Sequence, residues 1–522
     1  MDQSNKLILD VNESPKKISQ WIILAIQHIL AMFVACITVP LLVFAAYTVP
    51  EGFANAGAGV GFINASGAYL AGTFIAPTLV AAAIGTLIYI LLTKMKSPVF
   101  LASSFAYISP MIAAINLGAV AMTKDASGAL LVASAGDKVV GAFANLWALP
   151  VGMAMVGAVY VIVALVIKFA GVAWLNKLLP TIVIGPVIMV IGLGLAGSAV
   201  SNLTTASGSG QGYNLIALLC GLVAMVVTAL CAHYGKKTIA LIPFVLGMCA
   251  GYLTALVFTL IGYTACHNEY FHIINFDPIV NNFSNLTVRS FIDVPSFVFM
   301  PENVKAAAPL QASQLGTIAL LFIPVSLVTI CEHIGDHKNL SGIIGRDLLV
   351  EPGLSRTLMG DGIATAASGI LCGAANTTYG ENVAVVGVTK IASVKVIILA
   401  CLLTIAIAFL SPLMCVVETI PACVTGGVSL LLYGFIAASG VKMLIHEKVD
   451  FTKTKNIFVA SVILVSGIGG LVIGFTAGNV QITVTSTAVS MILGILMNRI
   501  LVEKKENKEE AIAEVAKDDK EA

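Results

Sequence analysis

The chain has 522 residues, of which 58% are hydrophobic and 11% charged, and its mean hydropathy is +0.98. Because a soluble domain carries about 25% charged residues, this composition excludes a soluble globular protein and predicts a polytopic membrane protein. The formal net charge of +1 gives no indication of a nucleic-acid partner.

Apolar segments close to the length of about 20 residues that crosses a bilayer form two sets of seven. The first set covers residues 20–47, 68–93, 97–118, 140–170, 175–198, 213–233 and 238–263. The second set covers residues 314–335, 357–373, 376–391, 393–416, 420–441, 455–475 and 481–502. We therefore predict an all-α fold with fourteen transmembrane segments. The mixed charges of residues 503–522 predict a disordered tail or a frayed helix.

The first apolar segment is long, follows about 19 polar residues and lacks a small-residue cleavage site, so no cleavable signal peptide is expected.

Basic residues at the segment ends predict the orientation. Basic residues flank the even-numbered connections: Lys94, Lys96, Lys168, Lys177, Lys236, Lys237, Lys338, Arg346, Arg356, Lys390, Lys395, Lys442, Lys448, Lys453 and Lys455. Because basic residues gather on the cytoplasmic side of a membrane protein, both termini are predicted to be cytoplasmic.

The sequence contains no convincing cofactor or metal motif. The ten cysteines lie mostly within apolar runs and show no CxxC spacing, so they predict neither a disulfide framework nor a zinc site. The stretch "GLGLAG" (192–197) matches GxGxxG, but it lies inside an apolar segment with no preceding strand and indicates helix packing. No cofactor and no metal are expected.

The two sets of segments resemble each other. "PTIVIGPV" (180–187) aligns with "PACVTGGV" (421–428) at an offset of 241 residues, and "SSFAY" (103–107) echoes "TTYGE" (377–381). Since each set holds an odd number of segments, the second copy must be inverted in the membrane. Chance similarity between apolar segments is the alternative. An inverted repeat predicts a secondary transporter with its site near the midplane.

Two corresponding segments are interrupted where a helix should continue. "LASSFAYISP" (101–110) and "NTTYGENV" (376–383) mix hydroxyl residues, Gly or Ala, and β-formers. We expect a short extended piece followed by a short helix in each, because irregular backbone at membrane depth is tolerated where it is buried or lines a cavity. Each helix N-terminus would then offer backbone N–H groups to a ligand. The alternative is an ordinary packing face rich in Ser and Thr.

Two carboxylates lie within the apolar segments, and both belong to the second set. Glu332 stands in "VTICEHIGD" and Glu381 follows Gly380. An ionisable residue at membrane depth usually faces a cavity and takes part in binding or transport. Both side chains could accept hydrogen bonds from ring N–H groups, and either could carry a proton. A structural glutamate is the alternative for either one.

Three other signals favour structural explanations. His333 and His337 are spaced i, i+4, but we place them at a cytoplasmic helix end without further ligands, so a zinc site is not expected. Asp361 is interpreted as a helix-start residue. Gly470 and Gly474 have the spacing of a helix-contact pair.

Five stretches together resemble the nucleobase–ascorbate transporter family, and in particular its bacterial uracil permeases. The resemblance runs from about residue 20 to 502. The stretches are "LAIQHILAMF" (24–33), "SSFAYISP" (103–110), "EHIGD" (332–336), "NTTYGENV" (376–383) and "GGVSLLLYGFIAASG" (426–440). The first contains Gln27 and His28.

The family signature is an acidic or amide residue, then N-x-G, four residues, Thr, and a basic residue or Gly. Glu381, Asn382, Thr389 and Lys390 fit it, whereas Ala384 replaces the usual Gly.

The resemblance implies a division into two domains. Residues 1–19 would be a cytoplasmic N-terminus. A core domain would comprise residues 20–174 and 314–416, and a gate domain residues 175–313 and 417–502, with the substrate between them. It also implies a homodimer in the cytoplasmic membrane.

The resemblance also implies a uracil site. Glu332 and Glu381 would bond the ring, the backbone N–H groups of Phe105 and Gly380 would meet its carbonyls, and Tyr433 would close over it. Uracil is planar and has two N–H donors and two carbonyl acceptors, which this set complements. Coupling to protons follows if a buried carboxylate must be neutral when the unloaded site crosses the membrane, and we assign it to Glu332 and Asp336.

The substrate assignment has alternatives. Uracil permeases usually have His where this chain has Asp336, and Asp at this position is more typical of purine and ascorbate members. Purine members typically have Gln where this chain has Glu381. A proton-coupled xanthine or urate permease is therefore the second candidate. An anion exchanger of related architecture is disfavoured by two glutamates at the site, a sodium site remains open, and no nucleophile–base pair indicates an enzyme.

Overall fold

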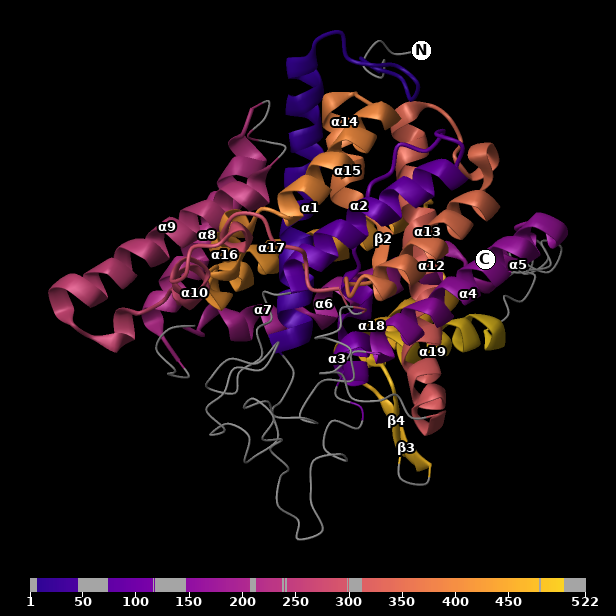
Figure 1. Ribbon diagram of the computed structural model, residues 1–522. Helices are drawn as coiled ribbons and strands as arrows, with labels where there is room; N and C mark the ends of the chain where they lie inside the picture. Colours follow the sequence, from indigo (N-terminus) through magenta and orange to yellow (C-terminus); the bar gives the residue numbers. More distant parts are fainter. Residues whose placement is uncertain are drawn as a thin grey trace, which may run out of the picture.

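The structure is a computed structural model. It describes residues 7–45, 74–115, 117, 147–206, 213–236, 239, 242–297, 299, 312–477 and 480–501. Parts of several predicted segments, and the charged tail 503–522, lie outside these residues. The described part is mostly helical, as predicted (Figure 1).

Most of the described helices lie within or overlap the predicted segments, whereas the helix at Asp277–Phe283 lies in the predicted connection 264–313. The helices of the first half are α1 (Ile18–Ala45), α2 (Ile75–Leu92), α3 (Ile108–Ile115), α4 (Ala148–Ala170), α5 (Ala173–Leu178), α6 (Thr181–Gly194), α7 (Ala196–Leu203), α8 (Leu215–Tyr234), α9 (Pro243–Ile261) and α10 (Asp277–Phe283). Those of the second half are α12 (Leu315–Ile344), α13 (Leu354–Ile370), α14 (Gly380–Thr389), α15 (Val394–Ala408), α16 (Ser411–Glu418), α17 (Ala422–His446), α18 (Thr454–Ile468) and α19 (Ser486–Ile500).

Many of these helices are apolar enough for a bilayer. In the part of the chain that the structure describes, eight candidate spans are long and apolar enough to cross a membrane, and four more apolar helices are shorter. The count of fourteen segments and the inverted repeat stay predictions.

The two interrupted segments meet in the middle of the molecule. Strand β1 (Leu101–Ser103) pairs antiparallel with β2 (Asn376–Thr378), with Ala102 opposite Thr377. A 3-10 turn, Phe105–Tyr107, and α3 follow β1, and α14 follows β2. The prediction that each segment contains an extended piece and a short helix is therefore confirmed.

Hydrogen bonds between side chains and backbone groups tie this small sheet to α2. Thr86 Oγ1 accepts from the Leu101 N–H at 2.9 Å, and Asn376 Nδ2 donates to the Ala81 carbonyl at 3.0 Å. Such partners are necessary because an unpaired backbone group in the membrane interior costs several kcal/mol by general estimates. The strands are thus held in place within the helices.

The helices pack as two groups. In one, α13 packs on α2 and α4, α15 on α1 and α2, and α12 on α4. In the other, α17 packs on α6, α7 and α8, α8 on α9, and α18 on α6 and α19. Figure 1 shows α8 and α9 on the left, away from α2, α13, α14 and α15. The groups meet where α12 contacts α6 and α19 and where α1 contacts α9.

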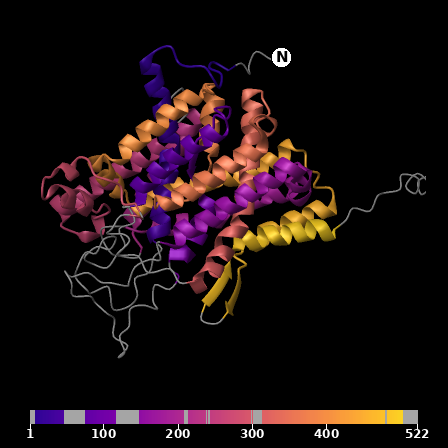
Figure 2. The ribbon, with the colours of Figure 1, turned by 45° about the vertical axis from the view of Figure 1, so that its right-hand side comes forward.

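The predicted segments 455–475 and 481–502 are wrong at their facing ends. Helix α18 ends at Ile468, α19 begins at Ser486, and between them β3 (Ile473–Ala477) and β4 (Val480–Val484) form an antiparallel hairpin. The hairpin projects from the helices in Figure 2. Gly470 terminates α18 with a left-handed φ of +75°. Gly470 and Gly474 are therefore a turn residue and a strand residue, not a helix-contact pair.

The approach of α17 to α8 depends on glycine. A Cβ at Gly427 would lie 2.7 Å from the carbonyl carbon of Gly221, whereas a Cβ at Gly434, also on α17, would meet no described atom within 4 Å. Gly427→Ala should therefore destabilise the protein by about 1–3 kcal/mol through overpacking. Thermal unfolding of the purified protein measures this effect.

Gly434→Ala is the matched control, since it makes the same chemical change in the same helix. Alanine favours a helix over glycine by roughly 1 kcal/mol, so this variant should unfold at or above the wild-type temperature. Equal unfolding temperatures for the two variants would contradict the predicted overpacking at Gly427.

Candidate functional site

The site is built around the start of α14. Tyr379 is extended, and Gly380 begins the helix, so the first N–H groups of α14 have no partner within the helix. A Cβ at Gly380 would lie 3.5 Å from Oδ1 of Asp336. Glycine thus leaves room between the helix start and α12.

Three carboxylates converge on this helix start. Glu332 and Asp336 lie one turn apart on α12, and Glu381 lies in the first turn of α14; all three are half-buried. Their charges are close enough to act on one another. Among the described residues, Oε2 of Glu332 and Oε1 of Glu381 are buried without a hydrogen-bond partner. These two oxygens are available to a ligand with N–H donors.

Asp336 is already engaged. Its Oδ2 accepts from Thr378 Oγ1 at 2.7 Å, which ties α12 to the last residue of β2. The bond holds Asp336 beside the start of α14, next to Gly380.

An aromatic pair joins the two helix groups. The rings of Phe105, in the 3-10 turn after β1, and Tyr433, on α17, meet edge to face with centroids 5.4 Å apart and an interplanar angle of 77°. Both side chains are buried. The 3-10 turn also contacts α12 and α6, which brings Phe105 near the carboxylate helix.

The signature residues divide between the two ends of α14. Asn382 lies in its first turn, where Oδ1 is 3.3 Å from Nδ1 of His28 on α1, and Gln27 is buried beside His28 in the sequence. Thr389 and Lys390 lie at the other end.

The C-terminal end of α14 is held by hydrogen bonds away from the carboxylates. Thr389 Oγ1 donates to the Val385 carbonyl at 2.7 Å. Lys390 ends the helix with a left-handed φ of 57°, and its carbonyl accepts from the Ile8 N–H at 2.7 Å. The structure therefore brings His28 and Asn382 together near the helix start and leaves Thr389 and Lys390 at the other end. Gln27 is buried on α1.

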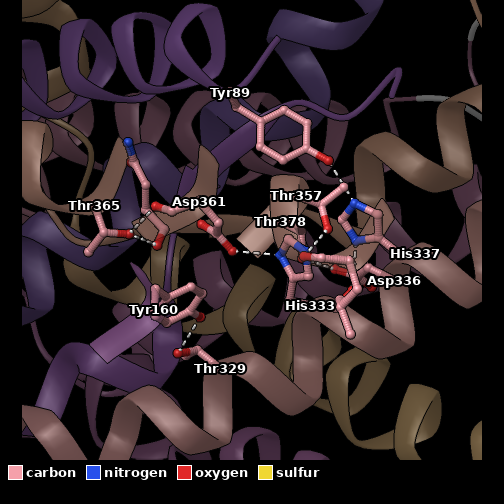
Figure 3. A network of polar contacts seen from close by, with 12 residues as sticks. Tyr89, Tyr160, Thr329, His333, Asp336, His337, Thr357, Asp361, Thr365 and Thr378 are labelled. Carbon is pink, nitrogen blue, oxygen red and sulfur yellow. Dashed lines mark hydrogen bonds and ion pairs between the residues drawn. The ribbon is translucent and has the colours of Figure 1, made fainter. Parts of the chain in front are cut away.

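The predicted positions of Asp361 and of the two histidines are wrong. Asp361 lies inside α13, and its Oδ2 is 2.8 Å from Nδ1 of His333; neither side chain is exposed. The rings of His333 and His337 stack at 4.0 Å within α12, and His337 is buried as well (Figure 3). These residues form a buried polar cluster rather than a helix start and a helix end.

The reason for this error is that the cluster depends on tertiary packing. Gly360 and Gly362 flank Asp361, and a Cβ at either would collide with Tyr89 or Tyr160. Close packing of α13 against α2 and α4 therefore buries a residue whose sequence neighbours suggest a turn. The "GDG" pattern within an apolar segment was the available signal.

Interrupted helices that meet near the middle of a membrane protein, beside half-buried carboxylates, are typical of secondary transporters, and the chain is a multi-pass membrane protein of this class. Residues 19–474 match the Permease family. The chain belongs to this family, the nucleobase–ascorbate transporters.

The relatives match over almost the whole chain. A uracil permease of Bacillus caldolyticus is 36% identical over 497 residues, with 95% of each chain covered. A uracil permease of Bacillus subtilis (strain 168) is 34% identical over 503 residues, with 96% of this chain and 97% of the other covered. Among solved structures, SLC26A9 matches with a TM-score of 0.56 at 14% identity over 93% of this chain and 66% of that chain. The last likeness concerns the fold alone.

Proposed function

We propose that this protein is a proton-coupled symporter that imports uracil across the cytoplasmic membrane. The observation that carries the proposal is the pair of unpartnered carboxylate oxygens, on Glu332 and Glu381, beside the start of α14. The names of the relatives, uracil permeases with matching length, support the choice of nucleobase.

Each group of the site has a partner on uracil. Glu332 and Glu381 accept from the two ring N–H groups, and the backbone N–H groups of Phe105 and Gly380 donate to the two carbonyls. Tyr433, which meets Phe105 edge to face, covers the ring. Aromatic groups prefer this offset or edge-to-face geometry, so a planar base can be held against the pair.

Transport requires the two helix groups to move against each other. We assign residues 20–174 and 314–416 to a core domain and residues 175–313 and 417–502 to a gate domain, with both termini in the cytoplasm. Lys338 on α12 donates to Glu447, which follows α17, at 2.9 Å. This ion pair links the two domains at their surface and must rearrange if they separate.

Proton coupling follows from the cost of charge in the membrane. An ionised carboxylate at membrane depth is costly, and three acidic side chains crowd this site. A proton on Glu332 lowers that cost, and we assign it the role of proton carrier. Asp336, one turn away, is its proposed partner in the relay.

The driving ion can be tested directly. Uracil uptake into proteoliposomes should be driven by an inward proton gradient, rise at acidic external pH and fall when a protonophore is added. Uptake that needs sodium and ignores the protonophore would contradict proton coupling, while uracil would remain the substrate.

Asp336→Asn separates the relay role from a structural one. The asparagine carbonyl can still accept from Thr378 Oγ1, so the link between α12 and β2 should persist and uracil affinity should stay close to that of the wild type. Loss of a proton-transfer group should lower gradient-driven uptake by about a hundredfold, the lower range for general acid–base groups. Binding calorimetry and uptake on the same preparation measure the two effects. Equal losses in binding and uptake would instead assign Asp336 to the binding site.

A further inference from the structure

Helix α12 has two polar faces. Glu332 and Asp336 lie on the face that meets α14, where Asp336 bonds Thr378. Thr329, His333 and His337 follow one another at intervals of four residues and lie on a second face. Their partners are Tyr160, Asp361 and Tyr89, on α4, α13 and α2 (Figure 3). The proposed uracil mechanism uses only the first face.

The second face buries ionisable groups without a permanent cation. Asp361 and His333 have no exposed side-chain surface. The titratable groups close enough to interact electrostatically with the pair are Glu332, Asp336 and His337 on α12, Tyr89 on α2, Tyr107 after β1, and Tyr160 on α4. No lysine or arginine is buried in the described part of the chain. Among the described residues, His333 is the group that contacts Asp361 directly and can become a cation.

The second histidine of this face, His337, forms hydrogen bonds through both ring nitrogens. His337 Nδ1 lies 2.8 Å from the His333 carbonyl, which can only accept, so this nitrogen carries a hydrogen. His337 Nε2 lies 2.6 Å from the Tyr89 hydroxyl, which also lies 2.8 Å from Ser97 Oγ. With Nδ1 donating, neutral His337 accepts the Tyr89 hydrogen. Both ring nitrogens of His337 therefore have hydrogen-bond partners.

The pair of Asp361 and His333, in contrast, contains polar atoms that form no hydrogen bond with any described residue. One oxygen of Asp361 (Oδ1) and one nitrogen of His333 (Nε2) have no hydrogen-bond partner among the described residues. Buried polar atoms are usually satisfied, and each exception calls for a physical explanation. A group that gains and loses a proton during a cycle is such an explanation.

We propose that Asp361 and His333 form a second proton-binding site, distinct from Glu332, in which a proton is held while uracil crosses the membrane. This inference rests on the proposed symport. With Asp361 ionised and His333 neutral, His333 Nδ1–H donates to Oδ2 and the pair carries one negative charge. A proton added at His333 Nε2 or at Asp361 Oδ1 makes the pair neutral overall.

Glu332 cannot hold the transported proton and accept from the uracil ring as a carboxylate at the same time. A second proton site at Asp361 and His333 removes this conflict. The charges of Asp361 and Glu332 act on each other, so a proton held by the pair favours the ionised form of Glu332. Glu332 can then accept from the uracil ring as a carboxylate while the moving helices carry one negative charge fewer. On the inside, uracil and the proton of the pair are both released, and the empty carrier returns without them. Glu332 then takes a new proton from the outside, so that one proton enters with each uracil.

Infrared difference spectroscopy on the wild-type protein without substrate tests the site independently of uracil transport. A pH change should produce a carboxyl band that shifts in frequency in Asp361→Glu, whose side chain keeps the acid but alters its environment. Absence of any pH-dependent band sensitive to this substitution would overturn the proposal, whatever the substrate proves to be.

Calorimetry of uracil binding in buffers of different ionisation enthalpy then counts the protons bound with uracil. Asp361→Asn and His333→Asn, which retain hydrogen-bonding groups in place of the titrating ones, should each lower this number by roughly one. Both should still exchange internal for external uracil but fail to accumulate it. Asp361→Glu should restore accumulation.

His337→Asn is the matched control, since it retains a donor for the His333 carbonyl and should keep wild-type proton binding and accumulation. Unchanged proton binding and accumulation in both Asp361→Asn and His333→Asn would overturn the proposal. Absence of uracil binding by the wild type would refute the proposed function instead, and the infrared titration would still decide the proton site.

Discussion

Replacing Glu381 by glutamine should weaken uracil binding about ten- to a hundredfold. A carboxylate only accepts hydrogen bonds, whereas an amide places either a donor or a weaker, neutral acceptor against the ring N–H. A hydrogen bond to a charged group contributes about 1.5–3 kcal/mol, and about 1.4 kcal/mol corresponds to one decade of affinity. Since Oε1 of Glu381 is buried without a partner among the described residues, no other contact of this oxygen should change.

Calorimetry of uracil binding to the purified protein measures this loss. Glu351→Gln makes the same chemical change at an exposed glutamate that is paired with Lys96 at the surface, and it should leave affinity unchanged. Wild-type affinity in Glu381→Gln would mean that the pocket lies elsewhere.

Replacing Glu332 by glutamine should be at least as damaging. The change removes a proposed ring acceptor and, with it, the proposed proton carrier. Binding should fall about ten- to a hundredfold for the same reason as at Glu381. Accumulation of uracil against its gradient should be lost altogether, because a glutamine at position 332 cannot take up or release a proton.

The two roles of Glu332 can be separated in proteoliposomes. Exchange of internal for external uracil needs binding and movement but no net proton transfer, so it should continue in Glu332→Gln at raised uracil concentration. Gradient-driven accumulation should not recover at any concentration. Accumulation that returns to the wild-type level once uracil is saturating would assign Glu332 to binding alone.

The interrupted segments could be predicted from the sequence because their signal is local. Hydroxyl residues and β-formers break two apolar runs at corresponding places, and the structure has β1 and β2 there. Glu332 and Glu381 were also accessible to sequence reasoning, since a carboxylate within an apolar segment is rare. Their convergence at one helix start agrees with the pocket that the family resemblance implies.

The contacts between helices could not be predicted in the same way. The bond from Thr378 to Asp336 joins residues 42 positions apart, and the pair of His333 and Asp361 spans 28 positions. Periodicity places such residues on a helix face but does not say which other helix covers it. The hairpin of β3 and β4 was missed because its apolar strands continue the hydropathy of α18 and α19.

Uptake of labelled uracil by proteoliposomes that contain the purified protein tests the central claim most directly. Under an inward proton gradient, uracil should accumulate, unlabelled uracil should compete for uptake, and an excess of xanthine or adenine should leave it nearly unchanged. Uptake of labelled xanthine that uracil does not inhibit, with no accumulation of uracil itself, would contradict the account and favour a purine permease.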